Sequence, residues 1–227
     1  MNIMKKAWIT TLCLLGALQL FAQEPLKDWA NFGKYEQENA TGKQPTVVFM
    51  GNSITEGWRA KDPDFFTQNN YAGRGISGQV SAQMLVRFRP DVIDLKPQAV
   101  VILAGTNDLA HNDYAFSPEK TFGNIVSMIQ LAEANQIKVI LCSTLPAYQF
   151  GWRKELRPAE EIKALNSKLK AYAHEHNITY VDFHAAMQDE RGGLPEKYSK
   201  DEVHPTLEGY KVMEKLVQDA IHKVLRK

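Results

Sequence analysis

The chain has 227 residues, which is enough for one well-buried domain and short for two. Its formal net charge is +1, with 23% charged and 44% hydrophobic residues, the composition of an ordinary globular protein. Because the sequence has neither a basic block nor an acidic tail, we expect no nucleic-acid partner and no long disordered region.

The N-terminal segment differs from the rest of the chain. Lys5 and Lys6 precede an apolar stretch, residues 7–22, that is too short to cross a hydrocarbon core of about 30 Å comfortably. A basic start followed by a short apolar segment is typical of a secretory signal peptide. We predict that residues 1–22 are removed on export to the periplasm or the medium, and that residues 23–227 form one domain without stable membrane insertion. The alternative is an uncleaved N-terminal membrane anchor.

The mature chain is expected to be nearly neutral. Losing two lysines with the segment leaves 25 basic and 26 acidic residues, a balance that favours an uncharged substrate over a polyanion. Cys142 would then be the only cysteine, and its place within an apolar run predicts a core residue rather than half of a disulfide.

Five runs of residues carry the strand signal. Four are apolar and nearly continuous, which is typical of parallel strands covered on both faces, and one is more polar and suggests an edge strand. The apolar runs are Thr46–Met50, Ala99–Ala104, Lys138–Ser143 and Thr179–Asp182, and the polar run is Asn69–Gly73.

Helical patterns separate these runs. Apolar residues recur every three to four positions around residues 80–88, 122–132, 162–172 and 210–224. The expected boundary residues are Pro90 at the end of the first helix, Ser117 and Pro118 at the start of the second, and Thr206 as the cap of the last.

Strands that alternate with helices predict an α/β fold with an open parallel sheet of about five strands and right-handed crossovers. Ligands bind such sheets beyond the carboxyl ends of the strands. At the N-terminal side, Trp29, Phe32 and Tyr35 recur at helical spacing and predict a short helix packed against the domain.

Ser53 follows the first apolar run within three residues, so its hydroxyl is expected at the carboxyl edge of the sheet. Gly51 and Gly57 allow a tight turn from strand to helix that points backbone N–H groups outward. A serine in such a turn is well placed as a nucleophile. The alternative is that Ser53 only caps the next helix.

A serine hydroxyl needs a base that takes its proton, and His204 is the best candidate among the histidines. Asp201 lies three residues earlier, so one turn can present the imidazole and the carboxylate together. The carboxylate can hold the Nδ1–H and leave Nε2 free to accept a proton from Ser53. The alternative is a loop histidine beside an unrelated surface carboxylate.

Acyl transfer also needs hydrogen-bond donors for the oxyanion. Asn107 follows the run Ala99–Ala104, and Gly78 lies in a loop where its N–H can approach a ligand; with the Ser53 N–H these give three donors. The alternative is an Asx turn at Asn107 and a simple bend at Gly78.

Residues 73–78 also fit the dinucleotide-binding pattern G-x-G-x-x-G. That pattern should follow a strongly apolar strand and precede an acidic residue at the end of the next one, and neither condition is met. We therefore expect no nucleotide cofactor. The histidine spacing predicts no metal site.

Taken in order, these segments closely resemble the SGNH, or GDSL-type, hydrolases over essentially the whole mature chain. Residues 51–57 look like the first block of that family, with Ser53 as the implied nucleophile. Gly78 and Asn107 look like the second- and third-block residues, and Asp201 with His204 looks like the last block.

The resemblance implies a flavodoxin-like three-layer α/β/α fold and hydrolysis of esters without a cofactor. Members include lipases, lysophospholipases, thioesterases, arylesterases and carbohydrate O-acetylesterases. One departure is Asn52, which stands where the family usually has Asp. Asn is nearly isosteric and keeps one acceptor, so we expect an altered turn rather than lost activity.

The substrate is predicted from side chains near the expected site. Trp58, Arg59, Trp152 and Arg153 could stack on a sugar and hydrogen-bond to it. With export and no long apolar lid segment, this favours removal of short acyl groups such as acetyl from a carbohydrate. The alternatives are a lipid or lysophospholipid acylhydrolase or thioesterase, and a non-catalytic carbohydrate-binding protein on the same fold.

Overall fold

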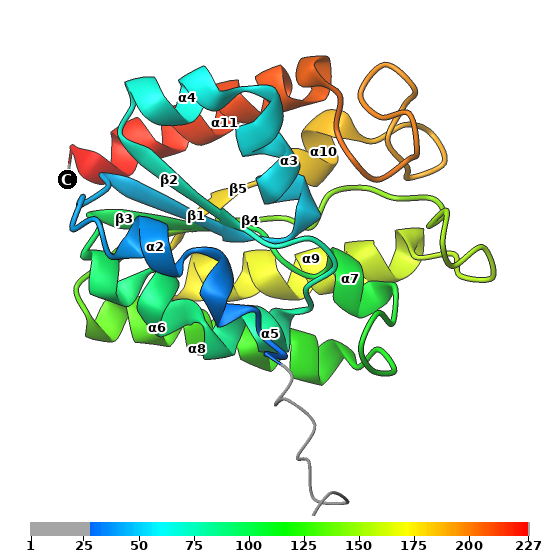
Figure 1. The fold of residues 1–227 in the computed structure, drawn as a ribbon. Coiled ribbons are helices and arrows are strands. Elements are labelled where there is room, and N and C mark those ends of the chain that lie inside the picture. Colours follow the sequence, from blue (N-terminus) through cyan, green and yellow to red (C-terminus); the bar gives the residue numbers. More distant parts are fainter. Residues whose placement is uncertain (1–27, 227) are drawn as a thin grey trace, which may run out of the picture.

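A computed structural model describes residues 28–226 of the chain, so the predicted signal peptide, residues 1–22, lies outside the described residues. The centre of the fold is a five-stranded sheet in which all neighbouring strands are parallel (Figure 1). The strand order is β2-β1-β3-β4-β5, the flavodoxin-like arrangement. The strands are β1 (Val47–Gly51), β2 (Tyr71–Gly75), β3 (Ala99–Ile102), β4 (Lys138–Cys142) and β5 (Thr179–Val181).

The predicted strands are confirmed, with small shifts at their ends. β1 and β3 are buried along their whole length, as expected for strands covered on both faces. The polar run forms β2 at an edge of the sheet, as predicted, but begins at Tyr71, two residues later than the sequence suggested.

Helices cover both faces of the sheet. The helical elements are η2 (Phe32–Lys34), α2 (Glu36–Asn39), α3 (Ser53–Lys61), α4 (Pro63–Gln68), α5 (Ser81–Val86), α6 (Phe88–Asp91), η3 (Ile93–Leu95), α7 (Thr106–Leu109), α8 (Pro118–Ala134), α9 (Ala159–Glu175), α10 (Phe183–Met187) and α11 (Leu207–Leu225).

Two apolar clusters hold the layers together, because alternate residues of each strand face opposite sides of the sheet. Val48 and Met50 of β1 pack with the cluster that includes residues of α5, α6, α8 and α9. Val47 and Phe49 pack with residues of α3, α4, α10 and α11. Figure 1 shows the same two helical layers on either side of the sheet. The predicted three-layer α/β/α architecture is confirmed.

Two predicted helix caps are confirmed, and one predicted helix end is wrong. Ser117 accepts from the Lys120 N–H at the start of α8, and Thr206 accepts from the Gly209 N–H at the start of α11, as predicted. Pro90 does not end a long helix. It lies inside the four-residue helix α6, where a proline in the first turn removes no intrahelical hydrogen bond.

The prediction that three aromatic residues of the N-terminal segment pack one short helix against the domain is wrong for two of them. The segment forms only the short elements η2 and α2, and Trp29 and Phe32 are 41% and 48% exposed. Of these three aromatic residues only Tyr35 is buried, and its hydroxyl donates to the Gly75 carbonyl at the end of β2. Polar contacts also attach the segment to the domain, among them the ion pairs of Lys34 with Glu56 and of Glu38 with Arg74.

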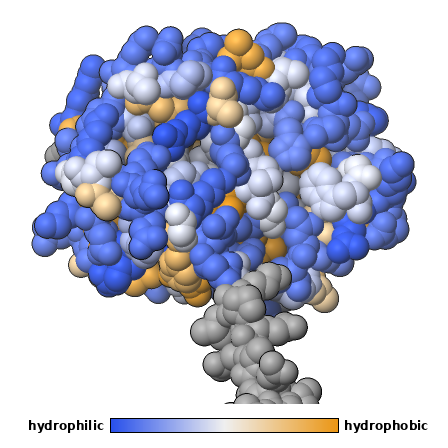
Figure 2. Space-filling view, in the orientation of Figure 1, coloured by the Kyte–Doolittle hydropathy of each residue, from blue (hydrophilic) through white to orange (hydrophobic). Residues whose placement is uncertain are grey.

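The surface seen in the orientation of Figure 1 is mostly hydrophilic, with apolar residues in small separate groups (Figure 2). None of the helices between residues 28 and 226 combines the length and apolar character needed to cross a membrane.

Candidate active site

The turn between β1 and α3 places Ser53 at the carboxyl edge of the sheet. Asn52 caps α3, and its Oδ1 accepts from the Ile54 N–H at 2.9 Å, so Asn supplies the acceptor that this cap requires. Close packing fixes the turn: a Cβ on Gly51 would lie 2.0 Å from Thr55 Oγ1, and one on Gly75 would lie 2.2 Å from the Glu56 nitrogen. Only glycine allows the ends of both strands to approach α3 so closely.

Ser53 and His204 meet at this edge although 151 residues separate them. Ser53 Oγ lies 2.9 Å from His204 Nε2, and His204 Nδ1 lies 2.7 Å from Asp201 Oδ2. Figure 1 shows the orange segment before α11, which carries the histidine, on the same side of the sheet as α3. Because an ionised carboxylate only accepts, Nδ1 donates to Asp201, and Nε2 is then the acceptor for the serine hydroxyl.

Asp201 sits in a tight turn that stabilises its charge. Its Oδ1 accepts from the N–H groups of Val203 and His204 at 3.0 and 2.7 Å and from Ser199 Oγ at 3.0 Å. Partial burial opposes ionisation, but the hydrogen bonds from His204 and Val203 outweigh it and lower the pKa of Asp201 to about 2. The carboxylate is therefore ionised at any pH at which the imidazole can act as a base.

Three potential donors for an oxyanion belong to this edge of the sheet. Asn107, in α7, uses one hydrogen of its Nδ2 for the Gln79 carbonyl at 2.9 Å, which leaves the other for a ligand. Gly78 has φ +79°, a conformation that glycine adopts without strain, and a Cβ there would meet nothing within 4 Å. Among residues 28–226, neither the Gly78 N–H nor the Ser53 N–H donates to another backbone carbonyl.

Asp108 is a buried residue whose role the sequence did not reveal. Its carboxylate accepts from the Ser81 N–H and hydroxyl, from Tyr114 at 2.7 Å and from Thr121 at 3.2 Å. Burial, together with the nearby charge of Asp108, raises the pKa of Tyr114 to about 12, so the phenol stays a donor. Asp108 thereby attaches α7, and with it Asn107, to α5 and α8.

One of the four predicted substrate-binding residues is too deeply buried to be available to a substrate. Trp58 is 1% exposed, stacks between Phe65 and Tyr210, and donates its indole N–H to Glu214 at 3.1 Å. Five positions after Ser53, it lies on the buried side of α3, and the apolar spacing of Ile54 and Trp58 was a sequence signal for this.

Arg59 was also predicted to contact substrate; this stays a prediction, and the contacts that the structure shows for Arg59 lie within the protein. Its guanidinium pairs with Glu38 at 2.9 Å and reaches the Gly73 carbonyl of β2 at 3.4 Å. These contacts engage its charge with the N-terminal segment and the edge strand.

Trp152, another residue predicted to contact substrate, borders the site. It is 44% exposed, and its ring centroid lies 6.2 Å from that of His204 and 5.3 Å from that of Phe150. Its indole N–H donates to Asn112 Oδ1 at 2.9 Å. An exposed indole next to the imidazole can contact whatever binds over the serine.

For Arg153, the last residue predicted to contact substrate, the structure shows hydrogen bonds within the protein, and its contact with substrate stays a prediction. Its Nε and Nη2 donate to the carbonyls of Ala110 and His111 at 3.2 and 3.3 Å. These bonds join the loop after β4 to the loop after α7, so the guanidinium is used by the protein itself.

The N-terminal segment supports the loop that carries Gly78, which no sequence pattern indicated. Glu56 accepts from the Ser77 N–H at 2.6 Å and pairs with Lys34 at 2.5 Å. Gln79 donates to the Ala30 carbonyl at 2.7 Å.

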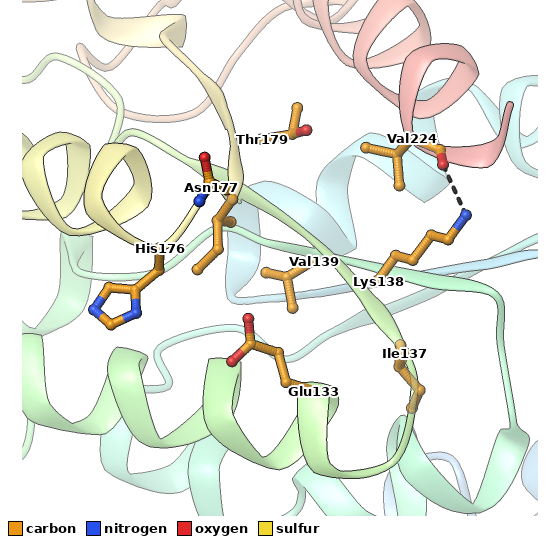
Figure 3. Close-up of a pocket in the computed structure, with 9 residues that line it drawn as sticks. Glu133, Ile137, Lys138, Val139, His176, Asn177, Thr179 and Val224 are labelled. Carbon is orange, nitrogen blue, oxygen red and sulfur yellow. Dashed lines mark hydrogen bonds between the residues drawn. The ribbon is translucent and has the colours of Figure 1, made fainter. Parts of the chain in front are cut away.

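A separate pocket lies at the other edge of the sheet. It is lined by residues at the start of β4 and β5, including Lys138 and Thr179, together with Glu133, His176 and Val224 (Figure 3). Because parallel strands run from this edge to the one that holds Ser53, the pocket is not an extension of the candidate site. Within residues 28–226, no cluster of three His, Cys, Asp or Glu side chains is arranged to hold a metal ion.

Comparison with known proteins gives the family. The model of the GDSL-like Lipase/Acylhydrolase family matches residues 49–212, which include the whole candidate site. The chain belongs to this family. A solved GDSL-like lipase from Bacteroides thetaiotaomicron is 52% identical, with a TM-score of 0.84, over 86% of this chain and 99% of that one. A solved structure from Bacteroides fragilis is 55% identical, with a TM-score of 0.86, over 88% of this chain and 99% of that one.

More distant relatives of this GDSL-like protein have curated descriptions. An acetylxylan esterase from Xylanibacter ruminicola is 23% identical over 77% of this chain and 42% of that protein. An uncharacterised lipoprotein from Bacillus subtilis is 29% identical over 48% of this chain and 46% of that protein. The chain thus spans less than half the length of each of these two curated relatives.

Proposed function

We propose that this GDSL-family protein is a carboxylic ester hydrolase in which Ser53, His204 and Asp201 form the catalytic triad. The observation that supports it most is the continuous contact from Ser53 Oγ to His204 Nε2 at 2.9 Å and from His204 Nδ1 to Asp201 Oδ2 at 2.7 Å. The alternative that Ser53 only caps α3 is disfavoured, because Asn52 is the N-cap of that helix and a cap would require no imidazole aligned in this way. The same alignment argues against a binding protein that has lost its catalytic residues.

The proposed reaction has two steps, each passing through a tetrahedral intermediate. Ser53 Oγ attacks the ester carbonyl while His204 Nε2 takes the hydroxyl proton, and Asp201 stabilises the imidazolium. The oxyanion accepts hydrogen bonds from the N–H groups of Ser53 and Gly78 and from Asn107 Nδ2. His204 then protonates the leaving alcohol, and the acyl group stays on Ser53. Water, deprotonated by His204, attacks this acyl-enzyme and releases the carboxylic acid and the free serine.

We propose a short acyl ester of a carbohydrate, such as an acetylated sugar, as the substrate. Trp152 supports this, because an exposed indole beside the catalytic base is suited to stacking on a sugar ring. The curated relative named as an acetylxylan esterase supports it further. Export by a signal peptide spanning residues 1–22, with residues 23–227 as the mature domain, belongs to the same proposal, since such a substrate lies outside the cell.

The first experiment tests the reaction. Wild type and Ser53→Ala are assayed with p-nitrophenyl acetate and with a fluorophosphonate probe. We expect turnover and labelling of wild type and neither for the variant, because the serine carries both the proton and the new bond. Substantial turnover by folded Ser53→Ala would remove this residue from the mechanism, and an inert wild type would favour the binding protein.

The second experiment tests the substrate. Rates on acetylated xylooligosaccharides are compared with rates on p-nitrophenyl esters of two to sixteen carbons. We expect acetyl esters to be the best of the chain-length series and acetylated sugars to give a higher kcat/KM than p-nitrophenyl acetate. Faster turnover of long chains would instead indicate a lipid acylhydrolase.

A further inference from the structure

We propose that Asn112 is a positioning residue that orients the Asn107 carboxamide toward the oxyanion. This inference rests on the proposed esterase function. Asn112 lies five residues after Asn107, and the sequence analysis does not point to it. Its contacts join the oxyanion donors to Trp152 in one hydrogen-bonded chain.

Asn112 and Asn107 are linked twice. The Asn112 backbone N–H donates to the Asn107 carbonyl at 3.1 Å, and the Asn112 Nδ2 donates to Asn107 Oδ1 at 2.9 Å. The same Nδ2 also approaches the Gly78 carbonyl at 3.4 Å. The backbone hydrogen bond fixes the separation of Asn107 and Asn112. It thereby restricts the geometry of the hydrogen bond between their side chains.

The direction of this chain is set at Trp152. An indole N–H can only donate, so the atom of Asn112 that faces it at 2.9 Å must be the oxygen Oδ1. The amide nitrogen of Asn112 then faces Asn107 and requires an oxygen there, which is Oδ1. The nitrogen of Asn107 is thereby directed to the other side, toward the Gln79 carbonyl and the site.

This orientation matters because the two ends of an amide have opposite effects on a negative charge. With Nδ2 toward the site, the hydrogen not used by the Gln79 carbonyl can donate to the oxyanion. A carboxamide turned by 180° would present an oxygen to the oxyanion and another to the Gln79 carbonyl. Both contacts would be repulsive, so the Gln79 carbonyl on one side and the hydrogen-bonded chain from Trp152 through Asn112 on the other favour the productive orientation.

Arg153 holds this hydrogen-bonded chain in place. Arg153 bonds the carbonyls of Ala110 and His111, next to Asn112 in the chain, and so fixes the loop of Trp152 against that of Asn112. The donors are therefore oriented before substrate binds, which is the condition for strong electrostatic stabilisation of a transition state.

The test begins with Asn112→Asp, assayed with p-nitrophenyl acetate. The new carboxylate still accepts from the Trp152 indole, but its second oxygen can only accept and draws the nitrogen of Asn107 away from the site. Loss of one oxyanion donor predicts a decrease in kcat of about 10²-fold, with KM changed by less than about threefold. Asn135→Asp is the matched control: it makes the same change at an exposed helix end, and its kcat should equal that of wild type.

A double-mutant cycle separates positioning from a general effect of charge or folding. If Asn112 acts through Asn107, adding Asn112→Asp to Asn107→Ala should lower kcat by less than about twofold further, because the group that it orients is gone. A further drop of tenfold or more in the double variant would overturn the inference, as would wild-type kcat in the single variant. An inactive wild type would instead contradict the proposed function, so the two failures are distinguishable.

Discussion

Replacing Asp201 by Asn tests the electrostatics of the proposed triad most directly. The carboxylate accepts two backbone N–H groups and the Ser199 hydroxyl on Oδ1, and the imidazole on Oδ2. An Asn side chain has one oxygen and one NH₂ group for these two positions. Because two backbone N–H groups need an acceptor at the first position, the oxygen is expected there and the NH₂ group beside His204 Nδ1.

This arrangement makes Nδ1 the acceptor and places the imidazole hydrogen on Nε2. The imidazole then donates toward Ser53 and cannot take its proton. A triad held in the wrong tautomer predicts a decrease in kcat of about 10⁴-fold, or about 5.5 kcal/mol in activation free energy. The fold should persist, since the hydrogen bonds from the N–H groups of Val203 and His204 remain.

The assay is kcat for p-nitrophenyl acetate, with Tm as the measure of folding. Asp189→Asn is a matched control, because Asp189 also accepts two backbone N–H groups, from Arg191 and Gly193, both at 2.9 Å, but contacts no imidazole. It should retain wild-type kcat. If folded Asp201→Asn keeps more than about a tenth of the wild-type kcat, the tautomer reasoning is refuted.

Three further predictions concern stability. The lowered pKa of Asp201 stabilises the fold above pH 3.8, and this contribution is lost as the pH falls toward about 2; the Tm difference between wild type and Asp201→Asn should shrink over that window, and a constant difference would contradict it. Trp58→Ala should lower the free energy of unfolding in urea by about 3–5 kcal/mol, whereas a change below about 1 kcal/mol would mean that Trp58 is not core. Gly51→Ala should lower both Tm and kcat, because its Cβ would lie 2.0 Å from Thr55 Oγ1, while Gly123→Ala, with nothing within 4 Å, should leave kcat unchanged; equal behaviour of the two would refute the packing argument.

The sequence by itself determined the sheet and the edge at which polar residues gather. Continuous apolar runs have few ways to be buried other than as covered parallel strands, and all parallel strands end at the same edge. The turns after β1 and β3 therefore had to bring Ser53 and Asn107 to one rim. Hydrogen bonding between Ser53 and His204 agrees with that expectation, and their catalytic roles remain predictions.

Only the tertiary structure decided what each side chain beyond that rim contacts. Trp58 and Trp152 both follow strands closely, yet one is enclosed by Phe65 and Tyr210 and the other is exposed beside His204. The spacing of apolar residues in the sequence predicts which side of a helix is buried. It does not predict which residues cover that side. Asn112 accepts a hydrogen bond from a tryptophan 40 residues away in the chain, and such a contact exists only once two loops have packed together.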